Sequence, residues 1–291
     1  MDSRGNIYYT DLKHIWKKSI DGQLSIAVKG VHSHELFIDT NDNLYGEHLW
    51  YSGEETNRWF RYLWCLKNDN TFIKLNDSLE GFNVNNSFIR DSDGNMYWSE
   101  QQEVSDSVSF IKYERSGNKV LIAKSRFQNI RWLFPGPGNN IYFLDMEDLY
   151  MLTSDGQFKL IAKDLAQGTW WTFLFGNDHS VFGIWFDDEN IYVAVYSDKC
   201  VKQILPSGDV SIIYHSGLGA PVAGLFDKKG QMQILEYISP FTTRLVEPEL
   251  TSISNAELWF KNNVVNTYTI LFVLFIAIDF VFRRRFRLHG R

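Results

Sequence analysis

Side chains that could bind a ligand recur at one position of a repeated pattern. The pattern is a turn rich in Asp, Gly and Asn that ends in Asn, or in Gln in its last copy. Five residues after each of these ends stand Asp11, His48, Glu100, Asp145, Val195 and Glu236. Most of these residues are carboxylates, so repeats arranged around an axis would gather negative charge. A divalent cation such as Ca²⁺, or a cationic ligand, would suit that charge.

Each of these carboxylates also has a local role open to it. An acidic side chain where a strand ends accepts hydrogen bonds from backbone N–H groups of the next turn. The exchange of Asp for Glu and the loss of the acid at Val195 favour this local role, because a metal shell tolerates less variation. Ligand binding at these positions stays the competing hypothesis.

Two other segments could contact a ligand. His32 and His34 are two residues apart and could ligate a metal from one face of a strand, although such pairs more often face solvent. The connection from Trp50 to Trp59 places polar residues between aromatic ones, which is typical of interfaces, so we predict a recognition loop there. The sequence contains no G-x-S-x-G, phosphate-loop, H-E-x-x-H or C-x-x-C motif.

A repeat positions these residues. The turn pattern ends at positions 6, 43, 95, 140, 190 and 231, which gives intervals of 37, 52, 45, 50 and 41 residues. A second turn and a β-rich run follow in each interval, so each repeat holds four short strands joined by tight hairpins. A sandwich or barrel could be built from such strands, but the constant internal order favours a six-bladed β-propeller. The predicted inner strands are Glu35–Ile38, Ser87–Ile89, Arg131–Phe134, Val181–Phe186 and Val222–Phe226.

The sixth repeat carries a family resemblance. Pro221, Gly224, Asp227 and Gly230 stand at the spacing of the NHL-type and gluconolactonase-like blade, and Gly5 to Gly22 are similar to the same blade. The chain thus resembles TolB-like six-bladed propellers over about residues 2–248. The resemblance implies the fold, whereas propellers of this kind serve as enzymes, binding modules or scaffolds. Gluconolactonase-like enzymes hold a divalent metal through a Glu, Asn and Asp set, which this sequence does not match.

The first and last repeats depart from the pattern. The sequence begins at the first turn of repeat one, so the innermost strand of that blade is missing. The last repeat offers Thr242–Pro248 as its third strand and only Glu249–Ile253 for a fourth. We hypothesise that Met1 is not the natural start and that upstream residues supply the missing strand and a signal peptide. The propeller is assigned to residues 1–253 and a linker to residues 254–263.

The C-terminal segment predicts a membrane anchor. Val264–Phe282 is a run of 19 mostly apolar residues, long enough as a helix to cross a hydrocarbon core of about 30 Å. Arg283, Arg284 and Arg285 follow directly, within a basic tail over residues 283–291. The positive-inside rule places this tail in the cytoplasm and the propeller outside, and a tail-anchored protein with a cytoplasmic propeller is the alternative. Asp279, one turn before Arg283, is explained by an ion pair near the interface rather than by a functional role.

Composition narrows the function. The 291 residues are 44% hydrophobic and 16% aromatic, which suits a large core, and we expect the aromatic residues to fill contacts between blades. The net charge is −6 although five arginines lie in the last nine residues, so the propeller itself is acidic and nucleic acid is excluded as a partner. Cys65 and Cys200 are predicted to be buried free thiols.

The predicted function is a binding or scaffolding module for a protein or a small ligand, attached to the lipid bilayer. A metal-dependent lactonase or esterase-like hydrolase at the channel mouth is the alternative, because the fold class includes such enzymes. A degenerate fragment without activity of its own is the third hypothesis.

Overall fold

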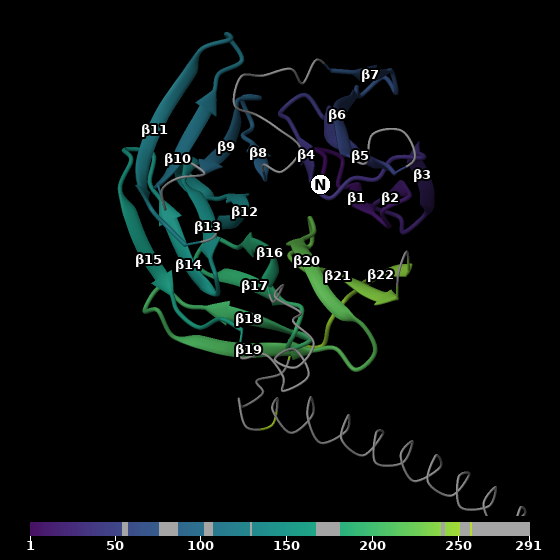
Figure 1. Ribbon diagram of the computed structural model, residues 1–291. Helices are drawn as coiled ribbons and strands as arrows, with labels where there is room; N and C mark the ends of the chain where they lie inside the picture. The colour runs from purple at the N-terminus through teal and green to yellow at the C-terminus, as the bar shows by residue number, and fades with distance from the viewer. Residues whose placement is uncertain are drawn as a thin grey trace, which may run out of the picture.

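The computed structural model describes residues 1–53, 58–75, 87–101, 107–128, 130–166, 181–239, 242–250 and 257. In these residues six antiparallel sheets stand around a common axis as the blades of a propeller (Figure 1). Four of the sheets have four strands, and the first and last sheets have three described strands each. The predicted all-β, six-bladed propeller is confirmed, and the sandwich and barrel alternatives are wrong.

We number the blades I to VI in chain order. Blade I consists of β1 (Ile7–Thr10), β2 (His14–Lys18) and β3 (Leu24–Lys29). Blade II consists of β4 (Leu36–Ile38), β5 (Leu44–Ser52), β6 (Arg58–Leu66) and β7 (Phe72–Lys74). Blade III consists of β8 (Phe88–Arg90), β9 (Met96–Gln101), β10 (Ser107–Tyr113) and β11 (Lys119–Arg126). Blade IV consists of β12 (Ile130–Pro135), β13 (Ile141–Asp145), β14 (Asp148–Leu152) and β15 (Phe158–Ala162). Blade V consists of β16 (Val181–Phe186), β17 (Ile191–Val195), β18 (Cys200–Ile204) and β19 (Val210–His215). Blade VI consists of β20 (Ala220–Phe226), β21 (Met232–Ser239) and β22 (Thr242–Val246). The inner strands of blades II to VI are β4, β8, β12, β16 and β20, and each agrees with its predicted range to within two residues at either end.

Each inner strand ends in a turn, and most of these turns are built on one aspartate. In blade III the Asp91 carboxylate accepts hydrogen bonds from the Asn95 backbone N–H (2.9 Å), the Asn95 side-chain amide (2.7 Å) and the Tyr97 hydroxyl (2.8 Å). Asp2, Asp39 and Asp187 make the equivalent bonds in their own turns. Side-chain bonds of this kind fix the turn, so they set the pairing register of the two strands that it joins.

The blades pack through aromatic and small residues. Tyr142 contacts Phe186 of the next blade at 4.7 Å between ring centroids, and Phe37 contacts Phe88 at 5.5 Å. Gly183 of β16 lies so close to β20 that an added Cβ would be 2.3 Å from the Val222 carbonyl oxygen. The aromatic residues therefore fill contacts between blades, as predicted from their position after each turn.

The remaining sequence predictions about the chain have mixed outcomes. Cys65 and Cys200 are buried free thiols, as predicted. Apart from Glu257, the predicted linker 254–263, the span 264–282 and the basic tail 283–291 lie outside the described residues. Among the residues that are described, no helix has the length and apolar character needed to cross a membrane.

Candidate functional site

An axial cavity of about 690 Å³ runs through the centre of the ring. The inner strands of blades II to VI line it, together with β1 of blade I and β21 of blade VI. Its walls are mainly apolar, with Leu36, Leu133, Ile184, Leu225 and Leu235 among the lining side chains. A cavity of this size and character is typical of sites that enclose a small organic molecule or a short peptide segment.

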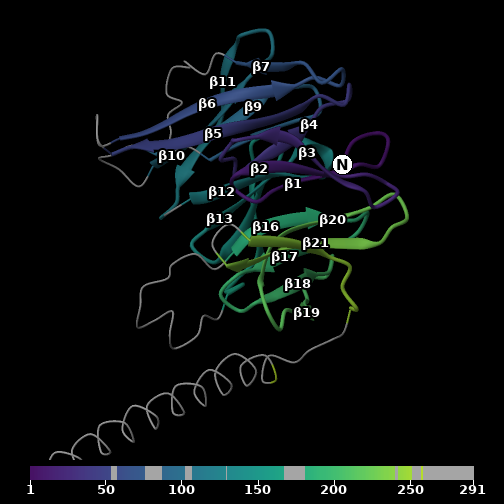
Figure 2. The same ribbon diagram turned by 90° about the vertical axis from the view of Figure 1, so that its right-hand side faces the viewer.

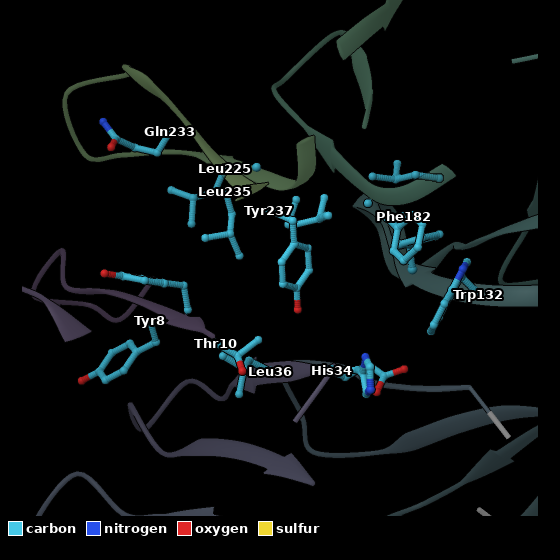
Figure 3. Close-up of a pocket in the computed structure, with 18 of the residues that line it drawn as sticks. Tyr8, Thr10, His34, Leu36, Trp132, Phe182, Leu225, Gln233, Leu235 and Tyr237 are labelled. Atoms are coloured by element: carbon cyan, nitrogen blue, oxygen red, sulfur yellow. The ribbon is translucent and has the colours of Figure 1, made fainter. Parts of the chain in front are cut away.

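Polar groups gather at one end of the cavity, which we call the rim: the end at which the inner strands begin. His34 and Glu35 precede β4 there, and the Tyr237 ring projects into the cavity from β21 (Figure 3). Trp132 lines the same cavity beside Phe182 (Figure 3), and its indole Nε1 is buried with no hydrogen-bond partner among the described residues. Burial raises the pKa of Tyr237, so its hydroxyl remains a hydrogen-bond donor. The lining of the cavity therefore includes a hydroxyl, an indole N–H, an imidazole and a carboxyl group to which a polar ligand atom could bond.

Two glutamates lie next to each other in the wall of the rim. Glu35 lines the cavity, and Glu47 of β5 is buried behind it, where its Oε1 accepts the His34 backbone N–H at 3.2 Å. Burial raises the pKa of Glu35 well above its usual range, and the charge of Glu47 and the hydrogen bond between the two carboxyl groups raise it further. The Arg61 guanidinium, 3.6 Å from Glu47 Oε2, and the Ser87 hydroxyl oppose this effect. Glu35 therefore keeps its proton to higher pH than an exposed glutamate does.

Three histidines connect the rim to the outside. His34 Nε2 lies 3.1 Å from His32 Nε2, and the His32 backbone N–H donates to Nδ1 of His48 at 3.0 Å. Burial lowers the pKa of all three imidazoles, which favours their neutral forms at physiological pH. His48 stacks on Trp50 with 5.5 Å between centroids, so the contacts run without a break from the cavity to the β5–β6 hairpin.

The β5–β6 hairpin presents aromatic side chains to solvent. It reaches beyond the neighbouring blades (Figure 2), and Tyr51 and Trp59 are about half exposed, at 49% and 52%. Trp50 pairs with Phe60 across the hairpin with stacked rings 5.4 Å apart, and Tyr51 pairs with Trp59 at the same centroid distance. The two ends of the predicted recognition loop are therefore exposed strand ends, residues 54–57 between them lie outside the described residues, and the role of the loop in recognition stays a prediction.

The first carboxylate at the recurring position bonds within its own blade. Asp11 accepts hydrogen bonds from the backbone N–H groups of Lys13 and His14, at 2.8 and 2.7 Å, and from Trp16 Nε1 at 2.8 Å. These are the local turn bonds that the alternative hypothesis requires. Each side chain at the recurring position is in a different blade, and none lines the cavity.

The other acidic members of this set lie beside cationic or polar partners. Glu100 is 3.1 Å from Lys119 Nζ and accepts a hydrogen bond from Trp98 Nε1 at 2.9 Å. Glu236 is fully buried and bonds to the Tyr214 hydroxyl at 2.6 Å and to Arg244 Nε at 2.7 Å. Asp145 ends β13 opposite Asp148. Over the part of the chain that the structure describes, no three His, Cys, Asp or Glu side chains converge as a metal site would require. Ligand binding by this set stays a prediction.

The sequence reasoning missed the two glutamates of the rim, although a signal for them exists. The turn at Asp39–Asn43 pairs Leu36 with Gly46, and one further step along the same register sets Glu35 opposite Glu47. Counting outward from the turn would thus have brought these two carboxyl groups together. Trp132 and Tyr237 come from distant blades, and only the closed ring brings them to the same cavity.

Comparisons with known proteins identify the fold. No protein-family model and no curated protein matches the chain. Among solved structures, the gluconolactonase XC5397 of Xanthomonas campestris is 12% identical, with 84% of this chain and 83% of that one covered and a TM-score of 0.58. The chain is a six-bladed propeller with neighbours of this type.

Two further neighbours are named for different functions. A streptogramin B lyase is 14% identical over 86% of this chain and 77% of that one, with a TM-score of 0.52. An auxiliary nutrient binding protein of Bacteroides thetaiotaomicron is 10% identical over 86% and 67%, with a TM-score of 0.58. Identities this low show the shared fold alone, so function has to be argued from the site.

Proposed function

We propose that this chain is a membrane-anchored propeller that binds a ligand in its axial cavity. The observation that carries this proposal is the cavity of about 690 Å³, apolar along its walls and polar at its rim. Burial of apolar ligand surface supplies the affinity, and the few polar groups at the rim orient the ligand.

The rim defines the chemistry of the ligand. Trp132 Nε1 is a buried donor without a partner among the described residues, and a buried polar group of this kind costs free energy until an acceptor reaches it. Tyr237 adds a hydroxyl, Glu35 adds a carboxyl group whose pKa is raised by burial, and His34 adds an imidazole whose pKa is lowered by burial. We therefore propose a largely apolar ligand that presents a hydrogen-bond acceptor, such as an amide or carboxyl oxygen, to Trp132.

The exposed hairpin extends the site for a larger ligand. Because His32 and His48 join the rim to Trp50 by direct contacts, a partner seated in the cavity can continue onto the aromatic pairs of β5 and β6. Aromatic side chains with one polar end are enriched at protein interfaces, which supports a protein partner over a free small molecule.

Membrane attachment is proposed from the sequence. The apolar run Val264–Phe282 and the arginines after it support a single-pass anchor with the propeller on the extracytoplasmic side. The buried thiols of Cys65 and Cys200 make a topology test straightforward, because a new surface cysteine would be the reactive one. In vesicles, an impermeant maleimide should label Ser116→Cys in the propeller from outside and Arg291→Cys only after lysis. The opposite labelling would show a cytoplasmic propeller.

Binding in the cavity can be tested with a library of apolar fragments that carry one acceptor group. The full chain is placed in lipid nanodiscs, and ligand-observed ¹⁹F NMR reports binding. Leu225→Trp fills the cavity, whereas Leu121→Trp adds the same ring at an exposed position of β11, where the leucine is 57% exposed. We expect the first variant to lose the fragments that bind the wild type and the second to keep them. Equal binding by both variants, or no binding to the wild type, would contradict the proposal.

A further inference from the structure

Four aromatic side chains from three blades gather at the rim of the axial cavity. Trp132 and Phe182 stand near the starts of the inner strands β12 and β16, and Tyr196 and Tyr237 stand near the ends of the second strands β17 and β21. All four line the cavity, and Figure 3 shows three of them around the same part of it as His34. We call these four residues the aromatic cluster.

Ring contacts connect the members of the aromatic cluster. The Phe182 ring contacts two others, with centroid distances of 6.1 Å to Trp132 and 5.0 Å to Tyr196. Both pairs are tilted, by 35° and 47°, so the rings do not form a flat stack. Burial raises the pKa of Tyr237, and the charges of Asp11 and Tyr196 raise it further, so Tyr196 lies near Tyr237 as well. The face of each ring carries a negative partial charge, which attracts cations.

The carboxyl group of Glu35 is connected to the strand of Trp132. The Ser87 hydroxyl oxygen accepts the Leu133 backbone N–H at 3.2 Å, and the same hydroxyl bonds to Glu35. Leu133 follows Trp132 in β12, and both residues line the cavity together with Glu35. A carboxyl group therefore lies at the same end of the cavity as the aromatic cluster.

The charges at this end of the cavity favour a positive ligand. The described residues place one guanidinium, that of Arg61, beside the pair formed by Glu35 and Glu47. A second positive charge would let both carboxyl groups ionise, because an opposite charge nearby favours the carboxylate. Among the described residues that line the cavity, none is a lysine or an arginine. The protein thus leaves this second charge to the ligand.

We propose that the ligand of the axial cavity is an organic cation, an alkylated ammonium group on an apolar body, which the aromatic cluster and Glu35 bind together. This inference rests on the proposed function, because it names the class of ligand for the same site. Cation–π attraction holds the ammonium group against the ring faces, and the Glu35 carboxylate balances its charge. The apolar body covers the walls, and an oxygen of the ligand accepts the hydrogen bond of Trp132 Nε1.

Other ligand classes fit the same residues less well. A neutral apolar molecule would use the rings only as apolar surface and would leave the Glu35–Glu47 pair with a single guanidinium. A sugar would bury hydroxyl groups against walls that are mainly apolar, and such groups cost free energy without hydrogen-bond partners. An anion would meet the carboxyl groups of the rim. Only a cation uses both the rings and the carboxyl group.

Hexanoylcholine and 3,3-dimethylbutyl hexanoate are matched probes for the charge. They have the same shape and the same ester group, and they differ in that a carbon atom of the second replaces the ammonium nitrogen. Each is titrated into the full chain in nanodiscs whose lipids carry no choline group, with empty nanodiscs as the blank, and displacement of a bound cavity fragment is followed by ¹⁹F NMR. We expect hexanoylcholine to bind about tenfold more tightly than the neutral ester. Equal binding of the two probes would overturn the inference.

Variants at Tyr237 separate the ring from its hydroxyl. Tyr237→Phe keeps the ring and should keep the preference for hexanoylcholine, whereas Tyr237→Leu keeps apolar bulk without a ring and should lose most of that preference. Tyr51→Leu makes the same change at a ring that is 49% exposed on the β5–β6 hairpin, and it should change nothing. The readout is the ratio of the two probes within one variant. If Tyr237→Leu binds neither probe, Phe182→Leu provides the same test at a second ring.

The pH dependence of binding tests the role of Glu35. The groups that face Glu35 are Glu47, Arg61 and the Ser87 hydroxyl, and His34 precedes it in the chain. A bound cation would lower the pKa of Glu35, so hexanoylcholine should bind more tightly as pH rises from about 5 to about 8, and the neutral ester should not. Glu35→Gln should remove this rise. A rise of the same size in the Gln variant would show that Glu35 is not the counter-charge.

The ammonium group can belong to a free molecule or to a side chain of a partner protein, and a peptide distinguishes these sources. The probe is Gly-Leu-trimethyllysine-Leu-Gly, and Trp59→Ser removes an exposed aromatic ring of the hairpin. Peptide binding that Trp59→Ser weakens, while hexanoylcholine binding stays the same, supports a protein source. Binding of hexanoylcholine alone supports a free molecule. Either result supports the organic-cation site.

The outcomes separate this inference from the proposed function. Fragments that bind in the cavity without any preference for the ammonium probe would overturn the inference and leave the cavity as a site for neutral ligands. Failure of the fragments and of both probes to bind would overturn both proposals. A preference for the ammonium probe that depends on the Tyr237 ring supports both.

Discussion

Replacing Glu35 by glutamine should stabilise the propeller, and the gain should grow as pH rises. Burial is the first cause of the raised pKa of Glu35, followed by the charge of Glu47 and the hydrogen bond between the two side chains. The amide of a glutamine can donate to Glu47 in place of the carboxyl proton, and it never has to ionise. The substitution thus removes the titration while keeping the contact.

The direction in which stability changes with pH follows from proton linkage. Because the pKa is raised in the folded state, the folded chain holds a proton that the unfolded chain has already released above its ordinary value of about 4.5. The free energy of unfolding therefore falls as pH rises above about 4.5, by up to about 1.4 kcal/mol per pH unit for one proton, until the folded-state pKa is passed. The Gln variant lacks this decline.

Thermal melts of the full chain from about pH 4 to about pH 8 measure the difference. For a domain of this size each 1 kcal/mol corresponds to about 2–4 °C in Tm, so the Tm advantage of Glu35→Gln should be near zero in acid and several degrees at neutral pH. Glu249→Gln changes an exposed glutamate and serves as the control. A Tm difference that is the same at every pH, or that shrinks as pH rises, would refute the reasoning.

Three further predictions concern packing, acid stability and thiol reactivity. Gly183→Ala should lower stability by about 1–3 kcal/mol in a urea melt, because its Cβ would meet the backbone of β20 at 2.3 Å, whereas Gly217→Ala, with no atom within 4 Å, should change little. Desolvation alone would raise the pKa of Asp187, but hydrogen bonds within its turn hold that pKa at about 2. The contribution of Asp187 to stability is therefore present above about pH 3.8 and is lost as pH falls towards 2. In an Asp187→Asn variant the free energy of unfolding should fall less steeply over this acid range, with a total difference of less than about 1 kcal/mol after solvent screening. Burial raises the pKa of both Cys65 and Cys200, so neither should react with a thiol reagent in the folded chain, and rapid labelling of either in native buffer would contradict the structure.

The fold could be predicted because its signals are local. The Asp–Asn turns carry their own hydrogen bonds, so a turn such as Asp91–Asn95 is specified within a few residues of sequence and ends the inner strand before it. The strand ranges depend on these turns and therefore agree closely with the structure. The first-turn tyrosines pack between blades for the same reason, since their position after the turn is constant.

The site could be predicted only in part. The recurring carboxylates were visible because they repeat, yet residues such as Asp11 are occupied by bonds to their own hairpins. The cavity depends instead on Trp132, Phe182 and Tyr237, which are single residues in different blades and follow no spacing rule. Their convergence is a property of ring closure, a long-range event that local sequence patterns do not encode.

Trp132 reports most directly on whether ligands bind in the axial cavity. In a chain labelled with 5-fluorotryptophan, the ¹⁹F resonance of Trp132 is assigned by its loss in Trp132→Phe. Binding of a cavity fragment should shift this resonance, because the indole Nε1 has no partner among the described residues until a ligand acceptor reaches it. The resonance of Trp16, whose Nε1 already bonds to Asp11 at 2.8 Å, should stay in place. Saturable binding that leaves the Trp132 resonance unshifted would show that the ligand binds outside the axial cavity.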